Sequence, residues 1–481
     1  MGYHRLAAMR SPQTNSRVVA IIVACAFIMQ QLDSTVVTTA LPQMAVSFHT
    51  DPVYLSIAVT SYLLGIAIFI PISGWVGDCF GGCNVFRAAI AIFTVGSIFC
   101  GLSTGVVELT IARVLQGLGG ALMVPVGRLL LFRNVQKSEL VDVMAFLQVP
   151  SQLGPLLGPP LGGFITTYAS WRLVFLINIP IGIAGIALAS LYITDDVESQ
   201  RRPLDYIGFL VSSAAVSGIM VGVELVSRSE LGGILGLGVI AAGIAIGGFA
   251  VWHMNRHPFP ILDMSVLRVR TFAVNFWGGS LFRAGTGSLS FLFPLLFQAI
   301  FGMSAFASGL LTLASAVGSM TMRLSAGRIL RRFGFRNVLA LNTLLSASFI
   351  AACLLFEMTT PSFILFGVLL IGGFIQALQF TSLQVLAYAD ITDAQMSSAT
   401  SIASMVQQLS RGLGIALVAG LLRVAHSRHS LPELAHSDIN AAFALSALIV
   451  ILSLPFYFLL TRDAAAEVSG HLQPATRVTQ K

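Results

Sequence analysis

The sequence predicts an all-α integral membrane protein with about fourteen transmembrane helices, built as two pseudo-symmetric six-helix bundles and an inserted helix pair. Composition is the first reason, because 56% of the 481 residues are hydrophobic and only 10% are charged. Soluble domains carry roughly 25% charged residues, so this chain cannot build a water-soluble surface. The apolar residues also form runs of about 20, the helix length that crosses a ~30 Å hydrocarbon layer.

Fourteen apolar segments follow one another along the chain. Six lie at 18–44, 53–76, 85–103, 106–131, 140–166 and 172–194, two at 205–226 and 231–254, and six at 272–299, 304–327, 337–356, 361–388, 397–422 and 440–460. This order predicts an N-terminal bundle (1–194), an inserted pair with a cytoplasmic linker (195–270), a C-terminal bundle (271–462) and a cytoplasmic tail (463–481).

The basic residues predict the orientation of these helices. Of the 27 Lys and Arg, nineteen fall in alternate segments that begin with the N-terminus or at the span ends next to them, four in the other loops and four elsewhere within the spans. Because cytoplasmic loops are rich in Lys and Arg, we expect both termini in the cytoplasm. The net charge of +7 is therefore assigned to these loops and not to nucleic-acid binding.

An internal repeat supports the division into two bundles. The residues from Gly74 to Gly81 and those from Gly327 to Gly334 both read glycine, three residues, a charge, two residues, glycine, at an offset of 253 residues. Both copies follow the second helix of a predicted bundle. Repeated halves with a site at their interface are typical of transporters, whereas a channel, the more distant alternative, more often places its pore between subunits.

Charged side chains within the spans are the first candidate functional residues, because each costs about 2.5–3.5 kcal/mol to insert. Asp33 lies roughly 23 Å from the inner face of the first helix, and Arg113 lies roughly 10 Å from the outer face of the fourth. Since these depths nearly coincide in a ~30 Å layer, we predict that both face one cavity and form a proton-coupling pair. A static ion pair that joins two helices is the alternative.

Arginines near the membrane midplane predict a substrate site. Arg283 maps onto Gln30 through the repeat, so we assign substrate binding to Arg283, Gln30 and Gln31, with Arg411 in the thirteenth helix. A guanidinium offers a fixed fork for carboxylate or phosphate groups. A pair between Arg283 and Asp33 is the alternative for Arg283.

Two segments are predicted to act as conformational switches. The first is the loop motif after the second helix, with Gly74, Asp78, Gly81 and Arg87. The second is a proline- and glycine-rich run in the fifth helix, where prolines remove backbone hydrogen bonds and glycines admit another backbone. Its members are Gly154, Pro155, Gly158, Pro159, Gly162 and Gly163.

Motifs for other chemistry are lacking in the sequence. It contains no GxxxxGK[ST], HExxH or GxSxG stretch, so an enzyme is not expected and the energy source is an ion gradient or the substrate's own gradient. Of the five cysteines, Cys79 and Cys83 share a short loop. No second cysteine pair or histidine cluster completes a zinc site with them. We therefore expect neither a metal nor a cofactor.

Several motifs together resemble the major facilitator superfamily. They are Leu32–Pro42 in the first helix, Arg113–Gly117 in the fourth, the Gly154–Gly163 run, and Trp171–Gly182 in the sixth. Within the superfamily the chain is similar to the fourteen-spanner drug:proton antiporters of the EmrB/QacA type, and Met123–Arg128 is closest to the MdtD-like branch. The loop motif departs from this family, because basic residues normally follow the acid that is Asp78 here.

The resemblance implies a proton-coupled antiporter that exports drugs or amphipathic and anionic metabolites by alternating access. It assigns proton coupling to Arg113 and antiport to the glycine-proline run. The expected partners are a small-molecule substrate, protons and the lipid bilayer, and a monomer in the bacterial cytoplasmic membrane is expected. Because four arginines and one clear acid lie inside the spans, an exporter specific for carboxylate-bearing metabolites is the alternative.

Overall fold

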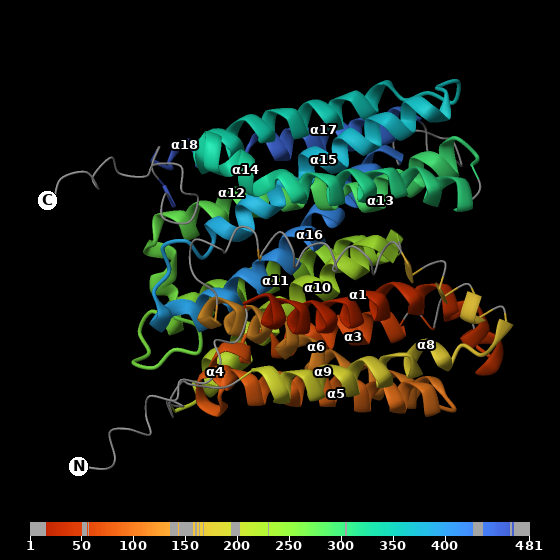
Figure 1. The fold of residues 1–481 in the computed structure, drawn as a ribbon. Coiled ribbons are helices and arrows are strands. Elements are labelled where there is room, and N and C mark those ends of the chain that lie inside the picture. Colours follow the sequence, from red (N-terminus) through yellow and green to blue (C-terminus); the bar gives the residue numbers. More distant parts are fainter. Residues whose placement is uncertain are drawn as a thin grey trace, which may run out of the picture.

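The computed structural model describes residues 16–50, 55, 57–134, 143, 157–158, 161–162, 164–166, 168–193, 203–228, 230–303, 305–426, 436–461 and 464–465. Every regular element within these ranges is a helix (Figure 1), which confirms the all-α prediction. The helices run roughly alongside one another.

The first helices of the chain lie together in the lower part of Figure 1. They are α1 (Ser16–Ser47), α3 (Ile57–Phe69), α4 (Ser73–Phe80), α5 (Gly82–Leu102), α6 (Val106–Asn134), α8 (Leu173–Leu176) and α9 (Asn178–Tyr192). Two long helices, α10 (Tyr206–Arg228) and α11 (Glu230–Met254), follow and pack against each other. A linker with the short 3-10 helix η2 (Met264–Arg268) leads from them to the second half.

The second half occupies the upper part of Figure 1, and its α16 lies against helices of the first half. Its elements are α12 (Arg270–Gly287), α13 (Leu289–Pro294), the π-helix η3 (Leu295–Ile300), α14 (Ala305–Ala352), η4 (Cys353–Leu355), α15 (Ser362–Leu386), η5 (Asp393–Gln395), α16 (Met396–His426), α17 (His436–Ile451) and α18 (Leu454–Phe458). The division of the chain at 194 and 271 stays a prediction.

Eleven helices in the described part of the chain are long and apolar enough to cross a membrane. The count is twelve when α3 and α4, which meet at a bend of 58°, are taken as one span. The apolar segment Ala307–Met322 falls within the predicted span at 304–327 but is shorter than the others. Most of the predicted span at 140–166 lies outside the described residues. The total of fourteen therefore stays a prediction.

The internal repeat has a structural counterpart at its final glycines. Gly81, between α4 and α5, has φ 83°, and Gly334, at the break within α14, has φ 73°. Side chains other than glycine rarely adopt this left-handed backbone conformation. The equivalent glycine in each half therefore makes the turn from one helix into the next, and α14 consists of two helices that meet at Gly334.

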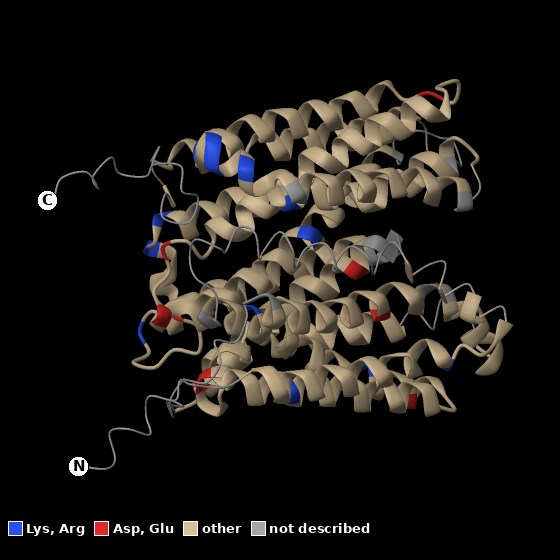
Figure 2. Ribbon diagram, in the orientation of Figure 1, with Lys and Arg blue, Asp and Glu red and all other residues tan. Residues whose placement is uncertain are grey.

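Most described Lys and Arg residues lie toward one end of the molecule, on the left in Figure 2. The two halves are in direct contact at this end. The Oγ atoms of Ser73 and Ser401 are 2.9 Å apart, and Ser397 Oγ donates to Asp78 Oδ1 at 2.5 Å. A Cβ atom on Gly74 would lie 2.7 Å from the Ser397 carbonyl oxygen. These contacts close the space between the halves at the end where the basic residues gather.

Glycines set the closest helix contacts, because side-chain packing and not the hydrophobic effect holds helices together in lipid. At the crossing of α3 and α6, a Cβ atom on Gly117 would lie 2.6 Å from the Tyr62 carbonyl oxygen. At the crossing of α12 and α16, a Cβ atom on Gly414 would collide with the Ala284 carbonyl oxygen. Both crossings lie next to helices that line the central cavity described below.

We expect Gly414→Ala to destabilise the protein by about 1–3 kcal/mol, the usual cost of an overpacked contact, because the new methyl group separates α16 from α12. Thermal unfolding of the purified protein in detergent measures the effect. Gly420→Ala is the matched control on the same helix, since nothing lies within 4 Å of a Cβ atom there. Equal melting temperatures for the two variants would contradict the close approach of α16 and α12.

Candidate functional site

A buried ion pair joins α1 to α6. Arg113 Nη1 lies 2.6 Å from Asp33 Oδ2, and both side chains have no exposed surface. The depth argument from the sequence therefore predicts the pairing correctly. Burying two charges is costly unless their geometry is good and other hydrogen bonds satisfy them, so the neighbouring polar groups decide whether the pair is stable.

Amide side chains satisfy the remaining oxygen of the acid. Gln116 Nε2 donates to Asp33 Oδ1 at 2.7 Å, and Asn178 Nδ2 donates to the same oxygen at 3.3 Å. Gln116 also accepts from Arg113 Nη1 at 2.7 Å, while Arg113 Nε donates to the Ala58 carbonyl oxygen at 2.8 Å. Both oxygens of the Asp33 carboxyl therefore have hydrogen-bond donors, from Arg113, Gln116 and Asn178, as a buried polar group requires.

Tyr62 covers the pair on one side. Its ring centroid lies 4.3 Å from Arg113 Cζ, a distance at which the ring face attracts a cation. Tyr62 lines the central cavity, whereas Asp33 and Arg113 do not. The expectation that the pair itself faces a cavity is therefore wrong for this conformation. Helix depth can be counted along the sequence, but the direction in which each side chain points depends on how the helices pack.

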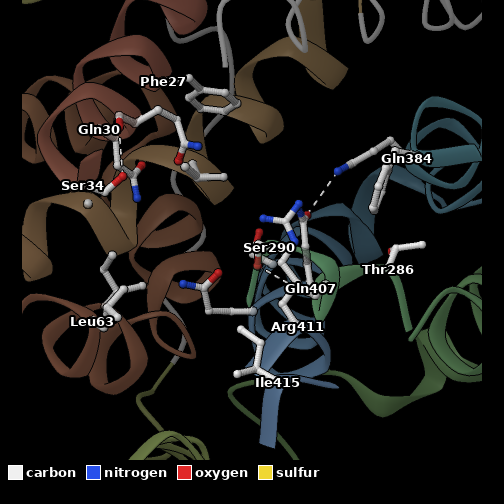
Figure 3. A pocket seen from close by; sticks show the side chains of 18 of the residues that line it. Phe27, Gln30, Ser34, Leu63, Thr286, Ser290, Gln384, Gln407, Arg411 and Ile415 are labelled. Carbon is white, nitrogen blue, oxygen red and sulfur yellow. Dashed lines mark hydrogen bonds between the residues drawn. The ribbon is translucent and has the colours of Figure 1, made fainter. Parts of the chain in front are cut away.

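A cavity of about 610 Å³ lies between the two halves. Figure 3 shows Gln30 and Ser34, on α1, on one side of it, and Gln407 and Arg411, on α16, on the other. Its polar lining is rich in glutamine: Gln30, Gln31, Gln376, Gln384, Gln407 and Gln408. Its apolar lining includes aromatic and aliphatic side chains from both halves: Phe27, Leu63, Ile66, Phe293, Phe349, Phe380 and Ile415.

The charge of the cavity lining is positive. Among the described residues that form it, Arg128 and Arg411 are the charged ones, and no Asp or Glu is present. Arg411 Cζ lies 5.9 Å from the Phe380 ring centroid, and no ion pair links Arg411 to another described residue. An exposed guanidinium in a cavity without acidic side chains among the described residues can bind a carboxylate or a phosphate through two parallel hydrogen bonds.

Arg128 is a site residue that the sequence reasoning missed, since it was counted with the inner basic residues. It lies within α6, is 7% exposed, and lines the cavity. Its Nη1 donates to Ser404 Oγ at 3.3 Å and its Nη2 to Gln407 Oε1 at 3.4 Å, so it joins the two halves across the cavity. The available signal was its position three residues after Pro125, inside an apolar stretch.

Only some of the predicted substrate-binding residues reach the central cavity. Gln30, Gln31 and Arg411 line the cavity, but Arg283 does not. Arg283 is 4% exposed and donates from Nη2 to Asn275 Oδ1 at 2.9 Å, within its own helix. The alternative pair between Arg283 and Asp33 is wrong, because Asp33 binds Arg113.

The predicted switch residues of the loop motif and of the glycine-proline run make different contacts. Arg87 donates from Nη2 to the Ile193 carbonyl oxygen at 3.3 Å, at the end of α9, whereas Asp78 contacts α16. In the glycine-proline run, a Cβ atom on Gly158 would collide with the side chain of Thr35, so this glycine lets the run approach α1. The Gly162 carbonyl oxygen accepts from Thr166 at 2.7 Å. The remaining members, Gly154, Pro155, Pro159 and Gly163, lie outside the described residues.

Two helical halves around a cavity, with a buried ion pair beside it, are typical of a secondary transporter. The comparison with protein families agrees, because the model described as Major Facilitator Superfamily matches residues 23–415 and 275–479. This chain belongs to the major facilitator superfamily. It is therefore a secondary transporter of the membrane and not an enzyme.

Curated relatives carry the printed name "Putative multidrug resistance protein MdtD". The protein from Serratia proteamaculans is 36% identical over 463 residues, which cover 95% of this chain and 96% of the relative. The protein from Cronobacter sakazakii is 38% identical over 411 residues, with 85% and 87% covered. The protein from Escherichia coli K12 is 36% identical over 440 residues, with 91% and 92% covered.

Solved structures agree on the fold alone. The human organic anion transporter MFSD10 superposes with a TM-score of 0.66 at 15% identity, covering 93% of this chain and all of that protein. The proton:xylose symporter XylE, bound to 6-bromo-6-deoxy-D-glucose, gives a TM-score of 0.62 at 15% identity, with 92% and 95% covered.

Proposed function

We propose that this chain is a proton-coupled antiporter that exports small molecules from the bacterial cytoplasm by alternating access. The observation that carries the proposal is the buried pair of Asp33 and Arg113 beside the central cavity. The names of the relatives, which refer to multidrug resistance, support export. The basic residues at one end of the molecule support an orientation with both termini in the cytoplasm.

Protonation of Asp33 is the proposed coupling step. A proton on this carboxyl removes its charge and weakens its bond to Arg113, whose guanidinium stays charged. The buried cation then lacks a counter-charge, which is costly at a site without exposed surface. A conformation that gives Arg113 another partner, or admits water to it, becomes favourable. Proton binding is thereby linked to the change between the two states of the transporter.

Tyr62 links the substrate to this pair. Its ring lines the cavity and also lies over the Arg113 guanidinium. A substrate in the cavity therefore touches the side chain that covers the pair, without contacting Asp33 itself. The contacts of Asp78 with Ser397 and of Arg128 with Ser404 and Gln407, like that of Ser73 with Ser401, must break when the cavity opens toward the cytoplasm.

Transport in proteoliposomes tests the proposal. The purified protein is reconstituted, and candidate drugs and organic acids are followed with and without a pH gradient. We expect saturable accumulation against the concentration gradient of the substrate when protons flow the opposite way, and counterflow exchange without any gradient. Saturable transport that ignores the pH gradient would exclude proton coupling. A current that does not saturate would indicate a channel.

We propose carboxylate-bearing metabolites as a second, narrower substrate class. The observation that favours them is the cavity lining, which holds two arginines and no acidic side chain among the described residues. A lipophilic cation would meet like charge there without a carboxylate to offset it. Six glutamines supply further donors for a carboxylate or phosphate. Competition between organic acids and cationic dyes in the same liposomes distinguishes the two classes.

A further inference from the structure

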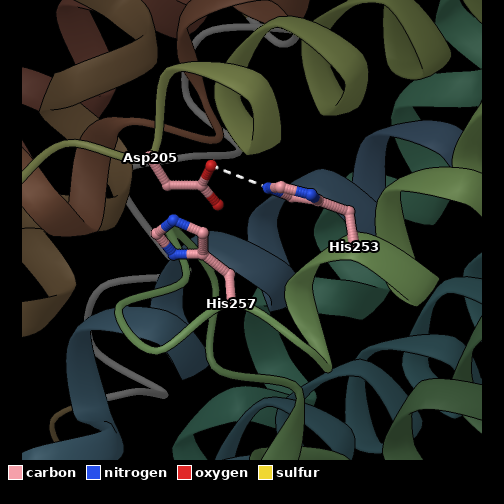
Figure 4. Close-up of side chains that lie close together, drawn as sticks. All are labelled: Asp205, His253 and His257. Carbon is pink, nitrogen blue, oxygen red and sulfur yellow. Dashed lines mark hydrogen bonds and ion pairs between the residues drawn. The ribbon is translucent and has the colours of Figure 1, made fainter.

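Three side chains with metal-binding atoms meet where the inserted helix pair begins and ends. Asp205 precedes α10, His253 lies in the last turn of α11, and His257 follows in the loop (Figure 4). His253 Nε2 lies 2.9 Å from Asp205 Oδ1, and one donor atom from each of the three residues lies within 4.8 Å of the other two. This cluster lies apart from the cavity and plays no part in the proposed transport cycle.

The backbone holds Asp205 in place as an ionised acceptor. Its Oδ1 accepts from the Gly208 N–H at 2.8 Å, as in a helix N-cap, and its Oδ2 accepts from the Ile261 N–H at 3.4 Å. Burial alone would raise the pKa of the Asp205 carboxyl, but the hydrogen bonds from Gly208 and His253 outweigh it and hold this pKa below its ordinary value. The carboxylate is therefore charged at neutral pH and available to a cation.

We propose that Asp205, His253 and His257 bind a divalent transition-metal ion with a preference for imidazole nitrogen, such as Zn²⁺. No metal was expected from the sequence, because Asp205 lies 48 positions before His253 and only the folded chain brings the two together. Two imidazoles and one carboxylate form a donor set that binds this class of ion, with water in the remaining positions. The cluster lies at the end of the molecule that we assign to the cytoplasm.

The geometry needs one adjustment to accept the ion. Tetrahedral zinc at about 2.0–2.1 Å from each ligand places donor atoms roughly 3.3 Å apart, so Asp205 and His253 are already close enough. His257 must move closer, by on the order of 1.5 Å. Its Nδ1 accepts from the Phe259 N–H at 3.2 Å, and binding through Nε2 exchanges this bond because Nδ1 must then carry the proton. Both residues lie in a short, partly exposed loop that can make this change.

A bound ion would join the linker to the start of α10. The linker also contacts the first turn of α16, where the Asp263 N–H donates to Ser398 Oγ at 3.0 Å. The competing interpretation is a helix cap in which His253 only donates a hydrogen bond to Asp205. This interpretation predicts no metal affinity, so direct binding separates the two.

Calorimetric titration of Zn²⁺ into the full-length protein tests the proposal. The protein carries an affinity tag without histidine and is kept in lipid nanodiscs. We expect one ion per chain at this site, and an affinity at least tenfold lower in His257→Gln and in Asp205→Asn. The asparagine keeps an acceptor for the Gly208 N–H, so the cap remains. Titration of Co²⁺ reports ligand number through its visible absorption.

The matched control removes the other histidines that lie close together in the sequence. A variant with His426→Gln, His429→Gln and His436→Gln should keep the site. Melting temperatures measured without metal show whether each variant is folded. The proposal is overturned if the wild-type protein binds no Zn²⁺ in the micromolar range, or if His257→Gln and Asp205→Asn bind it as tightly as the wild type.

Discussion

Asp33→Asn should abolish proton-driven accumulation of substrate while counterflow exchange without a pH gradient continues. Asparagine has nearly the same shape and still accepts from Gln116, but it cannot take up a proton. It leaves Arg113 buried without its counter-charge, and breaking a buried pair in this way costs about 3–5 kcal/mol. Transport in proteoliposomes measures the first effect, and thermal unfolding in detergent measures the second.

A double variant separates proton coupling from a static ion pair. Asp33→Asn with Arg113→Gln removes both charges, so most of the lost stability should return. If the pair only joins two helices, proton-driven transport returns with the stability. If the pair couples protons to transport, stability returns but proton-driven transport stays lost. Glu224→Gln in α10 is the control for a lost acid in another membrane-spanning helix, and it should leave coupling unchanged.

Arg411→Gln is expected to weaken the binding of carboxylate-bearing substrates roughly 10- to 100-fold, the equivalent of a lost hydrogen bond to a charged group at about 1.5–3 kcal/mol. The guanidinium faces the cavity without an acidic partner among the described residues, so a substrate carboxylate is the group that it would pair with. Saturation curves for counterflow give the change in KM. Uncharged substrates of similar size should show little change.

Arg283→Gln is the matched control, because Arg283 is an arginine of the same half that does not line the cavity. This variant should affect thermal stability more than KM. The opposite result, a raised KM in Arg283→Gln and an unchanged one in Arg411→Gln, would favour the assignment made from the repeat. An equal loss for cationic dyes and organic acids in Arg411→Gln would contradict the proposed charge preference.

The sequence predicted those features that depend on counting along a helix. Hydrophobic runs gave the helices, and the spacing of the repeat pointed to Gly81 and Gly334, which adopt the same unusual backbone conformation. Depth in the membrane, estimated from the rise per residue, brought Asp33 and Arg113 together although they are 80 positions apart. Each of these inferences needs only the periodic geometry of a helix and the thickness of the bilayer.

Features that depend on the direction of a side chain could not be predicted in this way. Arg283 and Arg411 both lie inside predicted spans, but only Arg411 lines the cavity. Repeat symmetry predicts that Arg283 lies on a helix equivalent to α1, but its side chain donates to Asn275 in its own helix. Gln116 and Asn178 could not be assigned to the ion pair in this way, because a polar residue in an apolar run does not reveal which neighbours satisfy it.

The position of Tyr62 between the ion pair and the cavity has a consequence for how such a protein can evolve. In the proposed mechanism, energy conversion depends on side chains without exposed surface, whereas substrate selection depends on a separate wall of glutamines, arginines and aromatic rings. Substitutions in that wall can change what is carried without disturbing the use of the proton gradient. Descendants of one ancestral transporter could thus acquire different cargoes while they keep the same means of powering export.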